Sequence, residues 1–381
     1  MNIFIIDLES VPTRYTCQWK GHIPTLLENA AKDRGRKDVE IINISGGEAE
    51  LKATPGAFLN FAQTNVYKNN QLTQVSQLFS EGKVNPGDQF IFTDAWHPGI
   101  MQLKYMSELL QIPVVIHALW HAGSYDPQDF LGRLIKDKRW TNNFEKAVFH
   151  AVDYNWFATK FHSDMFKTNV FRQRPGWSPD PAVSDLHVRE LDPESPSCKF
   201  RHTGWPMEYM ADTLEPYMNL PKRDLILFPH RIAPEKQVDI FRDLARQMPE
   251  FEWVVCQDEE LTKHEFHTLL GEAKIVFSAN LQETLGISTC IEGPLCGAIP
   301  MAPNRLSYSE IFDGYPQFMY PESWTKSFDW YDTHKNSMIE HVIGVIDSYK
   351  YLRADLEQFN KKQVPKYFAF DNAITVLFDG S

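Results

Sequence analysis

Short apolar segments alternate with longer amphipathic segments along both halves of this 381-residue chain. This alternation predicts parallel strands joined by helices, because a parallel connection has to cross back over the sheet. The sequence therefore belongs to the α/β class. The expected strands cover residues 2–6, 39–44, 89–93, 114–117 and 155–158, then 224–228, 252–256, 274–278, 298–301 and 317–320. Helices are expected near residues 23–31, 235–247, 262–270 and 287–295, with a helical tail from residue 336 that breaks near Pro365.

A segment rich in structure breakers separates the two halves. It runs from Arg174 to Pro181, contains three prolines and a glycine, and leads to residues 202–206. A chain of this length also exceeds one compact core of average size. We expect two Rossmann-like domains that face each other across a cleft, covering residues 1–205 and 206–360, with a tail of residues 361–381 returning to the first domain. A single enlarged sheet is the alternative.

The composition limits the classes of protein that fit. A hydrophobic content of 43% supplies two cores and argues against disorder, and a net charge of −12 gives no general basic surface for polyanions, although a local basic groove stays open. No signal peptide or membrane span is visible, and the five cysteines are scattered without metal or redox spacing. We expect a soluble, cytoplasmic protein without a bound metal or an obligate protein partner.

The first chemical motif follows the strand expected at residues 224–228. The sequence continues Pro229-His230-Arg231-Ile232-Ala233-Pro234-Glu235-Lys236. Arg231 and Lys236 can neutralise a diphosphate, and the start of a helix adds partial positive charge. The alternative is a basic pair solvated in a loop.

The second motif runs from Glu283 to Gly297. Gly286 allows close approach of the backbone before a helix expected from Ile287, where amides can face an anion or sugar oxygens. Glu292 is expected to accept hydrogen bonds from ribose hydroxyls, and Glu283 is placed to hold a transferred sugar. The alternative is an ordinary helix with one surface acid and one loop acid. The donor-binding set is His230, Glu283, Leu285, Gly286, Ile287 and Glu292.

The first half offers candidates for the acceptor side. His117 and His121 follow the apolar strand at residues 114–116, and either could orient a sugar or an acceptor. Trp96 and His97 lie after another strand and could stack on an acceptor. Each is as readily a structural core residue. Arg14 and Tyr15 are acceptor-binding candidates in a loop that could equally be solvated, and Glu145 is expected on a solvated helix face.

The residues of the second half resemble a known enzyme family. Arg231, Glu235-Lys236, Glu283, Gly286, Glu292 and Cys296-Gly297-Ala298-Ile299-Pro300 together look like the donor domain of retaining GT-B glycosyltransferases. His230-Arg231 and Asn304–Phe312 resemble tRNA-queuosine mannosyltransferases, and Glu292–Pro300 is similar to a stretch of bacteriophage DNA α-glucosyltransferases. The two glutamates enclose eight residues, one more than is usual in the family.

This resemblance implies retaining transfer from a UDP- or GDP-sugar without an obligatory metal or other cofactor. The sequence contains no Asp-x-Asp triplet, so Arg231 and Lys236 would stabilise the leaving diphosphate instead. The resemblance also implies that His121 or His117 lies near the reacting sugar, with the loop at residues 121–127 favouring His121.

The acceptor expected from the resemblance is a hydroxymethylated or otherwise modified base in nucleic acid, as in phage DNA modification, and a phage enzyme would act in the host cytoplasm. Queuosine in tRNA is one alternative, and a glycan, a lipid carrier or a small molecule is another. A sugar-nucleotide-binding module without catalysis is the remaining reading. The absence of a visible basic amphipathic helix argues against a lipid-linked acceptor.

Overall fold

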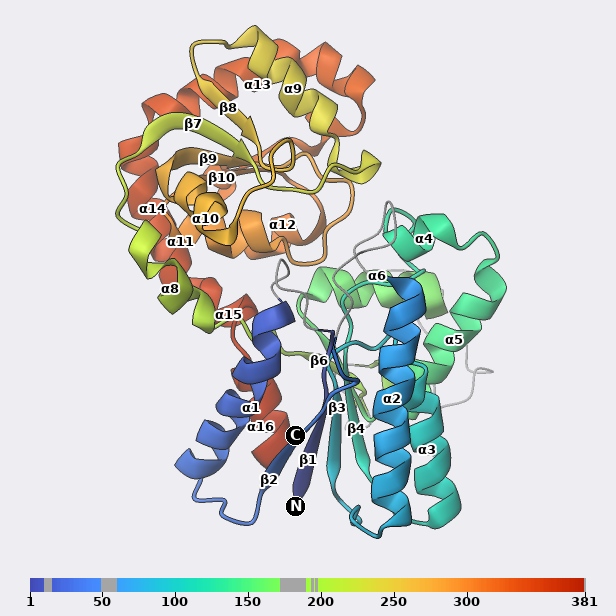
Figure 1. Cartoon of the computed structure of the whole chain (residues 1–381). Coiled ribbons are helices and arrows are strands. Elements are labelled where there is room, and N and C mark those ends of the chain that lie inside the picture. The colour runs from blue at the N-terminus through green and yellow to red at the C-terminus, as the bar shows by residue number, and fades with distance from the viewer. Residues whose placement is uncertain (10–15, 49–59, 172–189, 193–194, 196–197, 380–381) are drawn as a thin grey trace. The chain divides into compact units, whose positions relative to one another are not determined.

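The computed structural model describes residues 1–9, 16–48, 60–171, 190–192, 195 and 198–379. The chain divides into two compact units (Figure 1). Unit 1 consists of Met1–Pro206 together with Phe370–Ser381, and unit 2 consists of Met207–Ala369.

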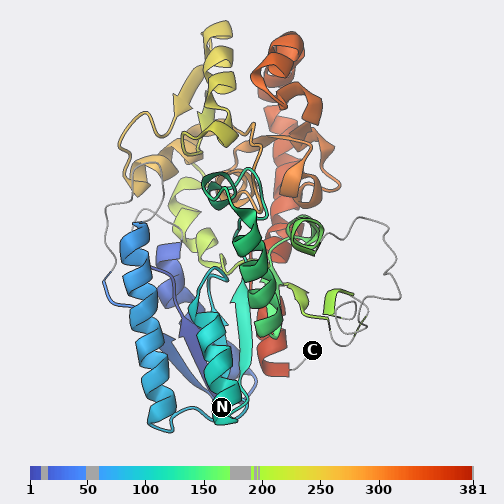
Figure 2. The ribbon, with the colours of Figure 1, turned by 90° about the vertical axis from the view of Figure 1, so that its right-hand side faces the viewer.

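Unit 1 is built on a six-stranded parallel sheet with the strand order β2-β1-β3-β4-β5-β6. Its central strands are almost wholly buried, as expected for a sheet covered by helices on both faces. In Figure 1, α1 and α16 lie on one side of the sheet and α2 and α3 on the other, and Figure 2 views the face covered by α2, α3 and α5. The strands are β1 (Asn2–Ile6), β2 (Glu40–Ile44), β3 (Gln89–Phe92), β4 (Val115–Leu119), β5 (Tyr154–Phe157) and β6 (Phe200–His202). The helices are α1 (Thr16–Asp33), α2 (Phe61–Ser80), α3 (Gly99–Leu110), α4 (Phe130–Leu134), α5 (Lys138–Ala151), α6 (Lys160–Phe171) and α16 (Asp371–Asp379).

The last helix belongs to unit 1 although the chain reaches it from unit 2. The Arg34 guanidinium donates two hydrogen bonds of 3.0 Å to the Asp379 carboxylate. The side-chain amide of Gln89 donates to the Leu377 carbonyl at 2.8 Å, and its oxygen lies 3.0 Å from the ring of His117. These contacts attach α16 to α1 and to the buried start of β3.

Unit 2 repeats the architecture with a five-stranded parallel sheet in the order β11-β10-β9-β7-β8. The strands are β7 (Arg223–Phe228), β8 (Glu252–Val255), β9 (Ala273–Phe277), β10 (Ile299–Pro303) and β11 (Met319–Tyr320). The main helices are α8 (Tyr209–Leu214), α9 (Val238–Gln247), α10 (Lys263–Glu272), α11 (Gly293–Leu295), α12 (Leu306–Ile311), α13 (Phe328–Asp347), α14 (Tyr349–Lys362) and α15 (Val364–Tyr367). Short turns of other helix types are η1 (Glu215–Tyr217), η2 (Pro234–Lys236), η3 (Ser288–Glu292), η4 (Pro316–Phe318) and η5 (Glu322–Thr325).

The two parallel sheets confirm the predicted α/β class, and the single enlarged sheet is wrong. The sequence missed β6, which has only three residues and one that is exposed. The helix expected over residues 235–247 begins only at Val238. Gln237 adopts a left-handed conformation with φ of 52°, because its side-chain amide is tied to the carbonyls of Ala279 and Thr325 at 2.6 and 2.7 Å.

In the part of the chain that the structure describes, no helix combines the length and the apolar character needed to span a membrane.

A substitution at Gly46 tests how closely α2 packs on the loop after β2. A Cβ atom at residue 46 would clash with the Tyr67 carbonyl oxygen of α2, so in Gly46→Ala either this loop or α2 must shift. We expect this change to lower the free energy of unfolding by about 1–3 kcal/mol, measured by urea denaturation. Gly21→Ala is the matched control, because a Cβ there meets nothing within 4 Å. An equal loss of stability in both variants would contradict the packing described here.

Candidate functional site

All strands of unit 2 are parallel, so their carboxyl ends meet at one edge of the sheet, where ligands of such folds bind. The loop after β7 carries His230, Arg231 and Lys236. The loop after β9 carries Asn280 and Glu283. The structure thus brings both sequence motifs of the second half to the same edge.

Lys236 connects these two loops. Its side chain is buried, and its ammonium group donates to the Gln282 carbonyl oxygen at 2.7 Å and to the Gln282 side-chain oxygen at 3.4 Å. It also forms an ion pair with the Glu283 carboxylate at 3.3 Å. A buried ammonium needs such partners, because an unpaired charge away from water is costly. The alternative of a solvated basic pair is therefore wrong for Lys236.

Glu283 is held in its ionised form. Burial alone would raise the pKa of its carboxyl, but the charge of Lys236, together with a hydrogen bond from the Gly286 backbone, outweighs this effect, and the pKa lies below its ordinary value. The side-chain amide of Asn280 also donates to Glu283 at 3.3 Å. The side chain keeps 20% of its surface exposed, so the carboxylate can still meet a ligand.

His230 lies beside this ion pair. It is 8% exposed, and burial, followed by the charge of Lys236, lowers the pKa of its ring to about 3. Its Nε2 atom is buried and has no hydrogen-bond partner among the described residues. A neutral imidazole with an unused nitrogen can donate to or accept from a ligand hydroxyl or phosphate.

Arg231 is half-buried and pairs with the fully buried side chain of Glu235, four residues on. The Glu235 carbonyl accepts from the Leu281 amide at 2.8 Å, so this pair is also fixed to the loop after β9. Because an arginine side chain has five N–H donors, its contact with Glu235 leaves the guanidinium further capacity toward an anion.

Gly286 turns the second loop back toward the sheet with φ of +77°, and a Cβ there would lie 2.8 Å from the Tyr308 ring. The helix expected from Ile287 is instead the π-helix η3 followed by α11. Leu285 is buried and Ile287 is half-buried beside the turn. The geometry agrees with a backbone that approaches a ligand closely, since π-helical turns are frequent at functional sites.

Glu292 lies at the end of η3 and is 8% exposed. Its carboxylate accepts a hydrogen bond of 2.7 Å from the Ser288 hydroxyl. Burial raises the pKa of this carboxyl, opposed by the hydrogen bond from Ser288. The alternative of a surface acid on an ordinary helix is therefore wrong, and the ribose-binding role stays a prediction.

The sequence analysis did not select Asn280 and Tyr308. The Asn280 amide donates to the Tyr308 hydroxyl at 3.0 Å as well as to Glu283, and both residues are fully buried. The Asn280 side-chain oxygen has no partner among the described residues. The signal available in the sequence for Asn280 was a polar residue three positions after the strand that ends at Phe277.

In unit 1, His121 follows β4 and is partly exposed. Its Nε2 atom lies 2.7 Å from the Thr93 carbonyl oxygen, and its ring packs beside Trp205 with centroids 4.7 Å apart. The Asp94 carboxyl lies near His121 and Lys68. Burial alone would raise its pKa, but the charge of Lys68, followed by that of His121, outweighs this effect and lowers the pKa. The structure therefore places a histidine with nearby charged partners at the carboxyl edge.

His117 lies inside the sheet and is fully buried. Its Nε2 atom contacts the Gln89 side chain at 3.0 Å, and burial lowers the pKa of its ring to about 3. A side chain with no exposed surface cannot touch a substrate in this conformation. The structure thus argues against the catalytic role considered for His117 and leaves His121 as the candidate.

Trp96 and His97 also differ in burial, since Trp96 is partly exposed and His97 is buried. Trp96 is half-buried against Phe144, with ring centroids 4.9 Å apart. His97 is 4% exposed, and its ring nitrogens lie 3.0 Å from the Gly99 amide and 3.2 Å from Gln71. Gln71 in turn donates to Asp7, so His97 belongs to a buried structural network. Arg14 and Tyr15 lie outside the described residues.

Among the residues that the structure describes, no group of three or more His, Cys, Asp or Glu side chains is arranged to hold a metal ion.

The comparisons with known proteins bear on the fold. No protein-family model and no curated protein matches the sequence. Among solved structures, sucrose-phosphate synthase from Thermosynechococcus elongatus matches with a TM-score of 0.56 at 11% identity, covering 100% of this chain and 97% of that chain. HepE from Anabaena, solved with UDP, matches with a TM-score of 0.45 at 10% identity, covering 95% and 98%. A glycosyltransferase from Rickettsia africae matches with a TM-score of 0.47 at 12% identity, covering 94% and 98%. The likeness to sucrose-phosphate synthase, together with the two parallel sheets, shows that this chain has the GT-B fold of glycosyltransferases.

The ion pair between Lys236 and Glu283 can be tested by titration. Lys236→Met removes the charge that opposes burial, so we expect the pKa of the Glu283 carboxyl to rise. In the wild type the carboxylate contributes stability at neutral pH that is lost as the pH falls through its lowered pKa, and this contribution should shrink in the variant. Carbon-13 NMR of the labelled glutamate carboxyl groups measures the shift.

Lys274→Met is the control for this titration, because Lys274 pairs with the exposed Asp224 instead. An unchanged Glu283 pKa in Lys236→Met would show that the ion pair does not set the charge of this site.

Proposed function

We propose that this protein is a retaining glycosyltransferase that transfers a sugar from a nucleotide-sugar donor to a hydroxyl group. The observation that carries the proposal is the cluster of Arg231, Lys236 and Glu283 at the carboxyl edge of the unit 2 sheet, in a chain with the GT-B fold. Two cations and an acid at one edge match a ligand that is anionic at one end and rich in hydroxyls at the other.

The donor diphosphate is assigned to Arg231 and Lys236. In the structure, the Lys236 ammonium is shared among the carbonyl and side chain of Gln282 and the Glu283 carboxylate. A phosphate oxygen would take the place of the 3.4 Å contact to the Gln282 side chain, which is the longest of the three. Both cations are paired with acids, Arg231 with the buried Glu235 and Lys236 with the partly exposed Glu283, so they are oriented before the donor arrives, as electrostatic catalysis requires.

The donor's hydroxyl groups are assigned to the carboxylates. Glu283 faces the transferred sugar, and Glu292 faces the ribose. His230 offers its unused Nε2 atom between the phosphate and the sugar. The backbone at Leu285, Gly286 and Ile287 is assigned to close contacts with the donor, and the tight packing of Gly286 against the Tyr308 ring fixes the position of this turn.

Transfer with retention follows a front-face course in this proposal. The bond between the anomeric carbon and the phosphate oxygen breaks, and the bond to the acceptor oxygen forms on the same face. The departing phosphate takes the proton of the acceptor hydroxyl. Arg231 and Lys236 stabilise the negative charge that grows on the diphosphate, so neither a metal nor an enzyme nucleophile has a step.

The acceptor is assigned to unit 1, with His121 as the residue that orients the reacting groups and Trp96 as an apolar surface. We propose a hydroxymethylated or otherwise modified nucleic-acid base in the cytoplasm, on the strength of the similarity of residues 292–300 to phage DNA glucosyltransferases. Queuosine in tRNA, a glycan, a lipid carrier or a small molecule is the alternative. Incubating UDP- and GDP-sugars with hydroxymethylated DNA, with tRNA or with neither, followed by mass spectrometry, separates an active donor site from each acceptor class.

Removal of either cation should abolish most of the turnover. We expect Lys236→Ala and Arg231→Ala each to lower donor hydrolysis by about a hundredfold to a thousandfold, because each removes a group that stabilises the leaving diphosphate. Donor hydrolysis without acceptor is measured by release of the nucleoside diphosphate. Arg242→Ala is the control, since Arg242 pairs with Asp258 on the exposed surface. Undiminished hydrolysis in Lys236→Ala would exclude the assigned chemistry.

The two histidines of β4 and its loop should behave differently. We expect His121→Ala to lower the transfer rate by about a hundredfold, because it removes the side chain assigned to orient the reacting groups. Its circular dichroism spectrum should match that of the wild type, because the side chain is partly exposed at the edge. His117→Ala should instead lower the melting temperature, because it leaves a cavity in the sheet. His264→Ala, on the surface of unit 2, serves as the control. A transfer rate unchanged in His121→Ala would remove this histidine from the proposal.

A further inference from the structure

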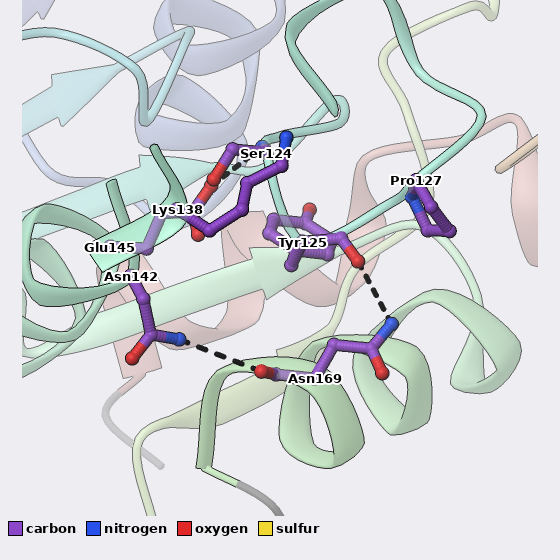
Figure 3. A pocket seen from close by; sticks show the side chains of 7 residues that line it. All are labelled: Ser124, Tyr125, Pro127, Lys138, Asn142, Glu145 and Asn169. Carbon is purple, nitrogen blue, oxygen red and sulfur yellow. Dashed lines mark hydrogen bonds between the residues drawn. The ribbon is translucent and has the colours of Figure 1, made fainter. Parts of the chain in front are cut away.

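Unit 1 contains a cavity of about 310 Å³ that none of the residues assigned above lines. It lies between the loop after β4 and the helices α5 and α6 (Figure 3). Its lining consists of Ser124, Tyr125, Pro127, Lys138, Asn142, Glu145 and Asn169. The volume is at the lower end of the range for small-molecule sites.

Glu145 is the unusual residue of this lining. The sequence placed it on a solvated helix face, and this was wrong, because the residue is 1% exposed. One carboxyl oxygen, Oε1, accepts from the Ser124 amide at 2.7 Å, whereas Oε2 has no hydrogen-bond partner among the described residues. Burial raises the pKa of this carboxyl to about 7. A buried carboxyl oxygen without a partner carries a cost that a ligand hydroxyl would remove.

Two asparagines complete the polar lining, and both amide nitrogens are already engaged. Asn142 donates to the Val170 carbonyl at 3.2 Å, and Asn169 donates to the Tyr125 carbonyl at 2.8 Å, the latter drawn in Figure 3. With their nitrogens fixed in this way, the side chains offer carbonyl oxygens as acceptors. Lys138 contributes an ammonium group that also contacts the Gly132 carbonyl.

We propose that this cavity binds a polyhydroxy ligand of the size of one sugar ring. A hydroxyl group both donates and accepts, so it can serve the acceptors on Glu145, Asn142 and Asn169 and the donor on Lys138. Tyr125 and Pro127 add carbon surface against which the face of a ring can pack. The site uses none of the donor-binding residues, so it goes beyond the proposed function and holds whether or not the chain transfers sugar.

Saturation-transfer NMR on the full chain tests this site directly. The probes are D-glucose, D-mannose and D-galactose at millimolar concentration, with 5-hydroxymethyl-2′-deoxycytidine as a comparison, each measured with and without excess UDP. We expect transfer to the ring protons of at least one sugar, unaffected by UDP. Glu145→Gln, which puts a neutral amide in place of the carboxylate acceptor, and Asn142→Ala, which removes a carbonyl acceptor, should each weaken this binding by about tenfold.

Asn143→Ala is the matched control, because Asn143 is an exposed neighbour on α5. Circular dichroism and donor hydrolysis on the same preparations show that the variants are folded, and they report separately on the donor site. Absence of sugar binding, binding that Glu145→Gln and Asn142→Ala leave unchanged, competition by UDP, or binding of the nucleoside alone would each overturn the proposal.

Discussion

The buried ammonium group of Lys236 is the contact on which the candidate donor site depends. It joins the loop after β7 to the loop after β9 through Gln282 and Glu283. A charge with so little exposure persists only where its partners are fixed, so these partners also fix the positions of the two loops. His230 and Asn280 are then held beside the ionised Glu283 carboxylate, and Arg231, on the same loop as Lys236, is paired with Glu235.

In both units the parallel strands end at one edge of the sheet, but the polar residues at the two edges are used differently. At the carboxyl edge of unit 1, Gln71 forms hydrogen bonds with both Asp7 and His97. These bonds hold β1, α2 and the loop after β3 together. His121 and Trp96 lie at that edge with part of their surface exposed. A polar residue after a parallel strand is therefore a candidate for function only if the packing leaves it a free face.

The sequence predicted the architecture well, because alternating apolar and amphipathic segments specify parallel sheets directly. The two motifs of unit 2 could also be selected from the sequence, because each follows a predicted strand and the carboxyl ends of parallel strands lie at one edge of the sheet. The sequence did not predict that Gln237 would delay α9, because that depends on carbonyls of residues 279 and 325 far away in the sequence. The burial of single side chains was also not predictable from the sequence. Nothing in the local pattern shows that His117 is buried while His121 is partly exposed, or that Glu145 faces inward.

The central claim is that Arg231 and Lys236 bind the diphosphate of a nucleotide sugar. A crystal structure of the full chain with UDP or GDP tests it most directly. The account predicts phosphate oxygens about 3 Å from the Lys236 ammonium and the Arg231 guanidinium, with the ribose hydroxyls at Glu292. A nucleotide bound elsewhere, with Lys236 still shared between Gln282 and Glu283, would contradict it.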